Sequence, residues 1–422
     1  MLNRTQLLNR VLSVLLACVI CAVLLGAANV GSAGLNDQIR RFSRAYEFDY
    51  LEWELGAFLQ KAVQAATKAE KLLNHDQQTR VVNSYFLAVR EQNQLETDLK
   101  NVLASPSAPD EVKAIELKQA LDLKTSELQK LSRLAEPIIQ NQTELSLTSL
   151  GFGFGGQVLP PVLYSVSEMP MNLIVSPRTE ISNLFEINLE PGLDVLEREK
   201  IENGLFSDFS LAALVEPIGG LGAYPTMVMQ SSDIAWLLDT VSHEWTHNWL
   251  TFHSLGMRYF TSDQLKTINE TTASISGKEI SRQTLKTWYP QYLPAEERTQ
   301  TTTPKKPVIP EKESFSFRRE MHTTRVRVDE LLKEGKVKEA EAYMESRRAF
   351  LWENGYRLRK INQAYFAFYG SYNDTPGGGA AGDDPVGPVV QQYRKQFTDF
   401  HRFMVKIASV KSFSELQGRL TR

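Results

Sequence analysis

The chain has 422 residues, of which 42% are hydrophobic, 23% charged and 9% aromatic, a composition that excludes a disordered, collagen-like or multi-span membrane chain. Lys and Arg number 47 against 50 Asp and Glu, so the formal net charge of −3 gives no indication of nucleic-acid binding. The two cysteines, Cys18 and Cys21, lie in an N-terminal apolar stretch, so any metal in the body of the chain must be held by His, Asp or Glu.

The N-terminal stretch predicts a membrane anchor. Residues 11–28 are almost wholly apolar, and no charged residue occurs from position 11 to position 36, which is about long enough to span a bilayer. We therefore expect a single uncleaved transmembrane anchor, with the body outside the cytoplasm. Small residues at positions 31–33 leave secretion after signal cleavage as the alternative.

Residues 36–147 predict long helices that form a hairpin or small bundle. Leu117, Leu121 and Leu128 recur at helical spacing among Glu, Lys and Gln, as in helices that pack by one face. A Ser- and Pro-rich break at residues 105–109 separates two such helices. Internal packing explains the apolar stripe better than a coiled coil that binds a partner.

The remainder, residues 148–422, mixes short strands with helices. Residues 162–166, 172–175 and 224–230 read as strands, and Pro225 suggests that the last is an edge strand. We expect helices at about 233–253, 267–282, 320–334, 336–372 and 386–408, the first capped by Ser231 or Ser232, and a polar, Pro-broken surface loop at 295–318. The predicted class is α+β, mainly α, with regions 1–35, 36–147 and 148–422.

The sequence VSHEWTHNWL contains the residues that point to metal binding and catalysis. It places His243, Glu244 and His247 in an H-E-x-x-H arrangement on a predicted helix. Residues four apart lie on one face of a helix, so both imidazoles can bind one cation. A carboxylate beside them can take a proton from a water molecule that attacks a carbonyl and return it to the leaving amine.

Two residues compete to be the third metal ligand. His253 stands where the third histidine of H-E-x-x-H-x-x-G-x-x-H would be, but Leu250 replaces the glycine that would turn the chain back. Glu270 is separated from His247 by 22 intervening residues, which is enough for a loop and the start of a second helix packed beside the first. We therefore predict Glu270 as the ligand, with Asn269 or Ser274 as a hydrogen-bond partner of a ligating histidine.

These motifs resemble those of the thermolysin-like metallopeptidases called gluzincins. The pairing of HEWTH with INETTAS, and the segment Ile361-Asn-Gln-Ala-Tyr365, is similar to a family of bacterial predicted aminopeptidases. The specific part of the resemblance covers about 40 residues. It implies a zincin-like core within residues 148–422 and a zinc hydrolase of peptide bonds with Glu244 as the general base. It leaves aminopeptidase and endopeptidase action open.

Stabilisation of the oxyanion of the tetrahedral intermediate usually comes from a Tyr, His or Arg side chain opposite the base. Tyr365, Tyr369 and Tyr372 follow one another at helical spacing before a glycine-rich segment, and Tyr369 is our choice among them. An aromatic stripe at this spacing also suits a hydrophobic core.

The sequence therefore predicts a membrane-tethered zinc metallopeptidase that acts on peptides or proteins. Zn²⁺ is expected to be held by His243, His247 and Glu270. Two alternatives belong to other classes: an inactive membrane-tethered metal-binding scaffold or adaptor, and a hydrolase of non-peptide amides. An intact Glu244 argues against the scaffold, because a structural zinc site needs no general base.

Overall fold

The structure is a computed structural model that describes residues 34–67, 69–103, 111–155, 157–221, 223–293, 315, 317–370 and 386–420. The chain divides into two compact units, Met1–Ala45 and Tyr46–Arg422. Helix α2 (Leu35–Ser43) belongs to the first unit, and the elements discussed below belong to the second. The predicted boundary near residue 147 stays a prediction.

The described part of the chain is mainly helical with three small sheets, which confirms the α+β, mainly α class. The helices of the second unit are α3 (Tyr50–Thr67), α4 (His75–Leu103), α5 (Glu111–Ser149), α6 (Val195–Phe209), α7 (Ile234–Leu250), α8 (Ser254–Met257), α9 (Asp263–Trp288), α11 (Phe317–Lys333), α12 (Val337–Glu353), α13 (Gln363–Gly370), α14 (Val386–Lys395), α15 (Phe400–Ala408) and α16 (Phe413–Leu420). The strands are β1 (Gly153–Phe154), β2 (Gln157–Val158), β3 (Tyr164–Val166), β4 (Met171–Pro177), β5 (Phe185–Leu189), β6 (Leu211–Pro217), β7 (Gly220–Leu221) and β8 (Thr226–Val228).

The expectation of membrane anchoring needs correction. Among the described residues, none of the helices combines the length and the apolar character needed to cross a membrane. Helix α7 is apolar but has 17 residues, whereas α9 has 26 residues and carries charged side chains along its length. Residues 11–28, on which the expectation rested, lie outside the described residues. The placement of the body outside the cytoplasm depended on that anchor and is withdrawn with it.

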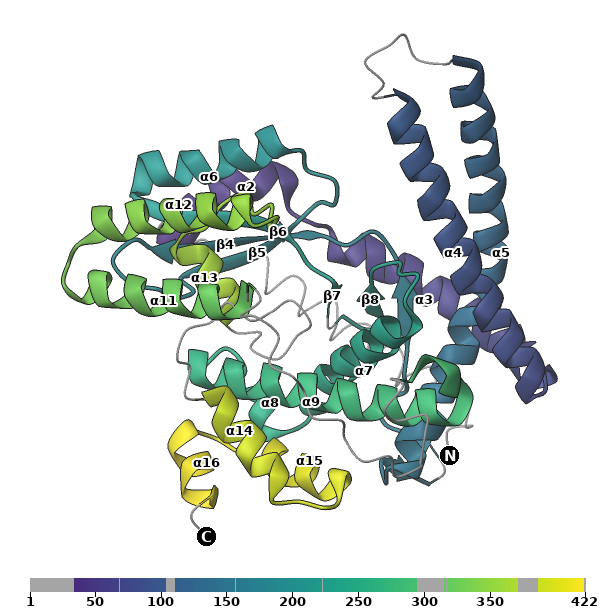
Figure 1. The fold of residues 1–422 in the computed structure, drawn as a ribbon. Helices are drawn as coiled ribbons and strands as arrows, with labels where there is room; N and C mark the ends of the chain where they lie inside the picture. Colours follow the sequence, from purple (N-terminus) through teal and green to yellow (C-terminus); the bar gives the residue numbers. More distant parts are fainter. Residues whose placement is uncertain are drawn as a thin grey trace, which may run out of the picture. The chain divides into compact units, whose positions relative to one another are not determined.

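Helices α4 and α5 lie side by side as a long hairpin (Figure 1). Their lower halves enter the main hydrophobic core, where Val82 and Phe86 of α4 meet Ile138 and Ile139 of α5. The predicted break at 105–109 lies outside the described residues. The hairpin thus has one end packed into the body of the unit, while its other end extends beyond it.

A buried ion pair ties α5 to the elements around it. The Nζ atom of Lys61 in α3 lies 2.5 Å from Oε2 of Glu136, and both side chains are buried. The other carboxylate oxygen of Glu136 accepts a hydrogen bond from the backbone N–H of Val166 in β3. One carboxylate of α5 thereby contacts both α3 and strand β3.

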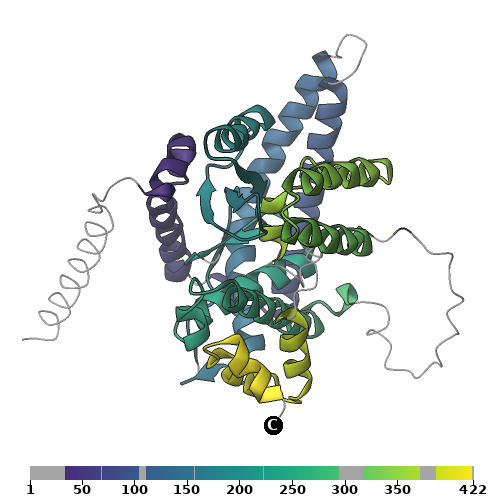
Figure 2. The same cartoon turned by 90° about the vertical axis from the view of Figure 1, so that its left-hand side faces the viewer.

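The larger sheet is antiparallel, with the order β5-β4-β6. Helix α13 packs on β4 and β6, and α11 and α12 lie on the same side of the sheet, as Figure 2 shows. A second core forms there from residues such as Ile174 and Leu214 together with the inner faces of the three helices. Strands β5 and β6 and helix α6 were not predicted from the sequence.

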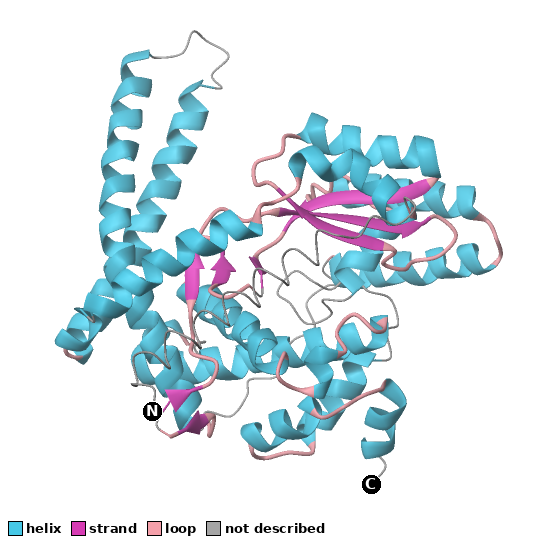
Figure 3. Ribbon diagram, turned by 180° about the vertical axis from the view of Figure 1, so that it is seen from behind, coloured by secondary structure: helices cyan, strands magenta, loops and turns pink. Residues whose placement is uncertain are grey.

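A second three-stranded sheet has shorter strands in the order β3-β8-β7, and we call it the smaller sheet. Figure 3 shows it apart from the larger one. Strand β8 pairs in parallel with β3 and antiparallel with β7, so the prediction that residues 224–230 form an edge strand is wrong. The reason is that Pro225 immediately precedes β8, and its missing N–H therefore does not interrupt the ladder. The edge strands are β3 and β7, and β7 packs against α7.

Helices α7 and α9 pack against each other, and α7 packs against β7 and β8 of the smaller sheet. Asp233 caps α7 by accepting hydrogen bonds from the N–H groups of Ala235 and Trp236, so the predicted Ser231 or Ser232 cap is wrong. Helix α7 also ends at Leu250, three residues before the predicted end. The C-terminal helices pack on α9, where Arg394 makes a bidentate ion pair with Glu279 at 2.6 and 2.9 Å.

The predicted helix at 336–372 is divided in two. Helix α12 ends at Glu353, and Gly355 follows with φ of +91°, a conformation that a side chain would strain. Helix α13 begins at Gln363. The predicted helix at 386–408 is likewise divided into α14 and α15. The predicted loop at 295–318 falls almost wholly outside the described residues.

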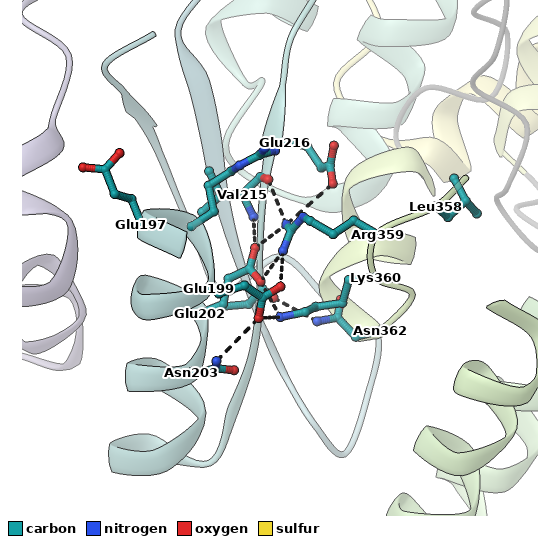
Figure 4. Close-up of polar contacts among 12 residues, drawn as sticks. Glu197, Glu199, Glu202, Asn203, Val215, Glu216, Leu358, Arg359, Lys360 and Asn362 are labelled. Carbon is teal, nitrogen blue, oxygen red and sulfur yellow. Dashed lines mark hydrogen bonds and ion pairs between the residues drawn. The ribbon is translucent and has the colours of Figure 1, made fainter. Parts of the chain in front are cut away.

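An ion-pair network fixes the connection between α12 and α13 (Figure 4). Arg359 pairs with Glu199 and Glu202 of α6, each at 2.6 Å, and Lys360 pairs with the same two carboxylates. Glu202 is buried and also accepts the backbone N–H of Val215 in β6 at 2.7 Å. The network joins α6, β6 and the start of α13.

Candidate metal centre

Two adjacent helices bring the three predicted ligands together. His243 and His247 lie one turn apart on α7, and Glu270 lies on α9 opposite them. The two Nε2 atoms are 3.1 Å apart, and Oε2 of Glu270 lies 3.5 Å from that of His243 and 3.4 Å from that of His247. Glu270 is 3% exposed, whereas His243 and His247 are 12% and 17% exposed, so the group opens to solvent on the histidine side.

These separations suit a tetrahedral metal ion. Ligand atoms at about 2.0–2.1 Å from Zn²⁺ lie about 3.3 Å from one another along the edge of a tetrahedron. Oε2 of Glu270 is buried and accepts no hydrogen bond from the described residues. Three electron-pair donors therefore converge on one point that a cation would occupy, and the residues fit a divalent metal.

Asn269 selects the form of His247 that a metal requires. Its Oδ1 atom lies 2.8 Å from Nδ1 of His247 and accepts a hydrogen bond from that nitrogen. Because Nδ1 carries the proton of the neutral imidazole in this arrangement, Nε2 is the nitrogen whose lone pair would be available to a metal ion. Asn269 was one of the two partners expected from the sequence. The other, Ser274, has a buried hydroxyl with no hydrogen-bond partner in the described part of the chain.

The electrostatics of the group reflect the convergence of one carboxylate and two imidazoles. Burial alone would lower the pKa of His247, but the Glu270 charge and neighbouring hydrogen bonds raise the pKa of His247 to about 9. Burial opposes ionisation of Glu270, yet the adjacent imidazoles hold the pKa of its carboxyl well below its usual range. The group thus favours an ionised Glu270 and attracts positive charge to the position between the three side chains.

Glu244 lies beside the three ligands and under strand β7. It is 8% exposed, and burial raises the pKa of Glu244. A Cβ atom added to Gly220 of β7 would lie 2.6 Å from Oε1 of Glu244 and 2.9 Å from Thr240. Only glycine at this position lets the strand approach the carboxylate so closely.

Tyr259 contacts the candidate metal site and was not singled out from the sequence. It lies in the connection between α8 and α9, its hydroxyl donates a hydrogen bond to Oε1 of Glu270, and its ring meets that of His247 edge-on at 6.1 Å between centroids. Lys266 lies 5.8 Å from the centre of the same ring. No sequence motif marks this tyrosine, because its role arises from the turn that brings it back over α7.

His253 is engaged away from the three ligands. Helix α7 ends at Leu250, so the chain turns before His253 rather than continuing as a helix through it. Nδ1 of His253 lies 2.9 Å from the carbonyl oxygen of Trp249, and the two rings are 4.0 Å apart. The group that could hold a metal ion in the described part of the chain contains His243, His247 and Glu270, without His253.

Tyr369 lies on α13 among aromatic side chains of the second core. Its ring centre is 4.4 Å from that of Tyr365 and 4.9 Å from that of Phe368. Burial raises the pKa of Tyr369 to about 12, and the charge of Glu216 adds to the effect. None of these contacts joins Tyr369 to the metal-binding group, so its part in oxyanion stabilisation stays a prediction. The glycine-rich segment that follows it lies outside the described residues.

Comparisons of the chain with family models, with curated proteins and with solved structures find no match. The resemblance to gluzincins therefore rests on the residues of α7 and α9 alone. What the structure establishes at this point is an α+β fold with a candidate metal site on two packed helices.

Proposed function

We propose that this protein is a zinc metallopeptidase, and that α7, α9 and the β3-β8-β7 sheet form its zincin-like core. The observation that carries the proposal is the convergence of His243, His247 and Glu270 at tetrahedral spacing, with the carboxylate of Glu244 alongside. A site that only binds metal does not need the Glu244 carboxylate. That carboxylate lies against Gly220, where the absence of a side chain lets strand β7 approach it closely.

The chain's own residues supply the rest of the chemistry. A bound Zn²⁺ provides a Lewis acid that polarises a scissile carbonyl and acidifies a water molecule. Glu244 takes the proton of the attacking water and returns it to the leaving amine. Asn269 and Tyr259 hold His247 and Glu270 in place.

The test combines metal content with peptide cleavage. We expect one zinc per chain by elemental analysis, lost in His247→Ala and Glu270→Ala and kept in His253→Ala. A mixed peptide library, read by mass spectrometry, should be cleaved by the zinc-loaded protein. Glu244→Gln should retain the metal and lose cleavage by at least about a hundredfold, within the range expected for a general base. Glu353→Gln, at an exposed position of α12, is the matched control.

The two alternative functions are separated by the same experiment. Zinc bound at full occupancy, with no cleavage of free, N-blocked or protein substrates, would favour the scaffold. Cleavage of simple amides in place of peptides would favour a hydrolase of non-peptide amides. Cleavage unchanged in Glu244→Gln would contradict the assigned mechanism.

A further inference from the structure

A lysine on α9 connects the candidate metal site with the larger sheet. Lys266 lies near the N-terminal end of α9, one turn before Glu270, where the helix dipole disfavours a positive charge. Its Nζ atom lies 2.7 Å from Oε2 of Glu186 in β5, and the lysine side chain is 12% exposed. Helix α9 and the larger sheet contribute to different hydrophobic cores, so this ion pair joins two parts of the unit. The position of Lys266 therefore needs an explanation.

The carboxylate of Glu186 is held in place on its own sheet. Its Oε1 atom accepts a hydrogen bond from Nδ2 of Asn172 in β4, and Oε2 accepts one from Nδ2 of Asn183, each at 2.6 Å. Burial opposes ionisation of Glu186, but the charge of Lys266 and these hydrogen bonds hold the pKa of its carboxyl below its usual range. The sheet thus presents a fixed negative charge to Lys266.

Lys266 and Glu270 contact the same tyrosine from one face of α9. The two residues are four apart, so their side chains lie one turn from each other. The Nζ atom of Lys266 lies 5.8 Å from the centre of the Tyr259 ring, within the range of a cation–π contact. The hydroxyl of Tyr259 donates to Oε1 of Glu270. Helix α9 therefore holds Tyr259 at two points, of which one is the predicted metal ligand.

We propose that Lys266 is a positioning residue of the metal centre. Anchored by Glu186, its ammonium group keeps the ring of Tyr259 in the orientation from which the hydroxyl reaches Glu270. The inference rests on the metal site of the proposed function and adds the larger sheet to the elements that determine its geometry. Loss of the lysine charge would free the ring, and Glu270 would lose the hydrogen bond that limits its rotation. A lysine that only tied α9 to the sheet would affect stability and leave the affinity for metal unchanged.

The first arm of the test measures zinc affinity by competition with a chromophoric chelator. We expect Lys266→Met to lower the affinity about tenfold, the low end of the range for partners of metal ligands, and Lys266→Arg to keep most of it. Lys124→Met is the matched control, because Lys124 on α5 pairs with Glu91 at 2.7 Å and is 20% exposed. Glu186→Gln should lower the affinity severalfold through the loss of the anchoring charge. Unchanged or increased affinity in Lys266→Met would overturn the proposal.

The second arm asks whether Lys266 acts through Tyr259. In the Tyr259→Phe background, Lys266→Met should change the zinc affinity by less than about twofold, because the effects of residues in one chain of contacts do not add. The cobalt spectra of Lys266→Met and Tyr259→Phe should differ from that of the wild type in the same way. A loss of affinity in the Tyr259→Phe background as large as in the wild type would show that Lys266 acts by another route, and would also overturn the proposal.

The outcomes separate this inference from the proposed function. Zinc binding with the expected coupling between Lys266 and Tyr259, and no cleavage of any peptide, would contradict the peptidase and leave the positioning role standing. Zinc-dependent cleavage without the coupling would contradict the positioning role alone. Failure of the wild type to take up zinc or cobalt would contradict both.

Discussion

Tyr259 links the third ligand of the candidate metal site to the connection between α7 and α9. Because its hydroxyl donates to Oε1 of Glu270, it restricts that carboxylate to presenting Oε2 toward the histidines. We expect Tyr259→Phe to lower zinc affinity by about ten- to a hundredfold, as removal of a hydrogen-bond partner of a metal ligand does elsewhere.

Competition with a chromophoric chelator measures this affinity directly. The electronic spectrum of the cobalt-substituted protein should change in Tyr259→Phe, because the freed Glu270 can rotate. Tyr292→Phe is the matched control, since that hydroxyl bonds to Asn83 away from the site. Equal zinc affinities and identical cobalt spectra in the wild type and Tyr259→Phe would remove Tyr259 from the metal centre.

Gly220 controls the position of the proposed general base. An alanine there would place its Cβ 2.6 Å from Oε1 of Glu244, so either the carboxylate or strand β7 must move. We expect Gly220→Ala to lower kcat by at least about tenfold while zinc content stays at one per chain, since misplacement of a catalytic group by about 1 Å is costly. Gly56→Ala in α3, where an added Cβ meets nothing within 4 Å, should leave kcat unchanged.

At the scale of the elements, the ion pairs around Glu202 decide whether α6, β6 and α13 stay together. Glu202→Leu would remove the buried one of the three carboxylates that pair with Arg359 and Lys360, and would leave the N–H of Val215 without its acceptor. We expect the free energy of unfolding to fall by about 3–5 kcal/mol, the range for breaking a buried pair.

Urea denaturation followed by circular dichroism provides the measurement. Glu330→Leu is the control, because Glu330 pairs with Arg327 at an exposed position where both side chains are about half exposed. Its denaturation midpoint should match that of the wild type. A midpoint of Glu202→Leu equal to that of the control would show that the network contributes nothing to docking.

For the molecule as a whole, the metal site joins two helices of the main core, so metal binding should stabilise the entire second unit. A ligand that binds only the folded state adds about 4 kcal/mol when its free concentration is a thousand times its Kd. We expect chelation to lower the thermal unfolding midpoint by several degrees and added zinc to restore it. His247→Ala should already have the lower midpoint and should not respond to the chelator. A wild-type midpoint that chelation leaves unchanged would argue against a bound ion.

The sequence was most informative where a pattern is local. Residues four apart on a helix share a face, so the position of His243 relative to His247 followed from spacing alone. Spacing did not predict that α7 ends at Leu250. Glu270 required one further step, the packing of a second helix. Local patterns do not specify which strands pair, and β8 became a central strand because β7, a two-residue strand, pairs with it from the other side.

The features that escaped prediction depend on contacts between distant parts of the chain. Tyr259 acquires its place from a turn whose close packing depends on Gly256. Strand β6 pairs with β4 about forty residues before it, and Arg359 reaches back to Glu202 across the sheet. Such pairings depend on complementary surfaces that only the folded chain brings together.

The short distance along the chain between the metal-binding residues bears on the order of folding. His243 and Glu270 are joined by one helix, a 12-residue connection and the first turns of a second helix. Closing a loop of this size costs little entropy, whereas docking of α13 on β4 must bring together residues separated by nearly two hundred positions. We therefore expect α7 and α9 to associate early, once residues up to about 288 have emerged during synthesis. Binding of the metal ion therefore does not require the C-terminal helices to have folded.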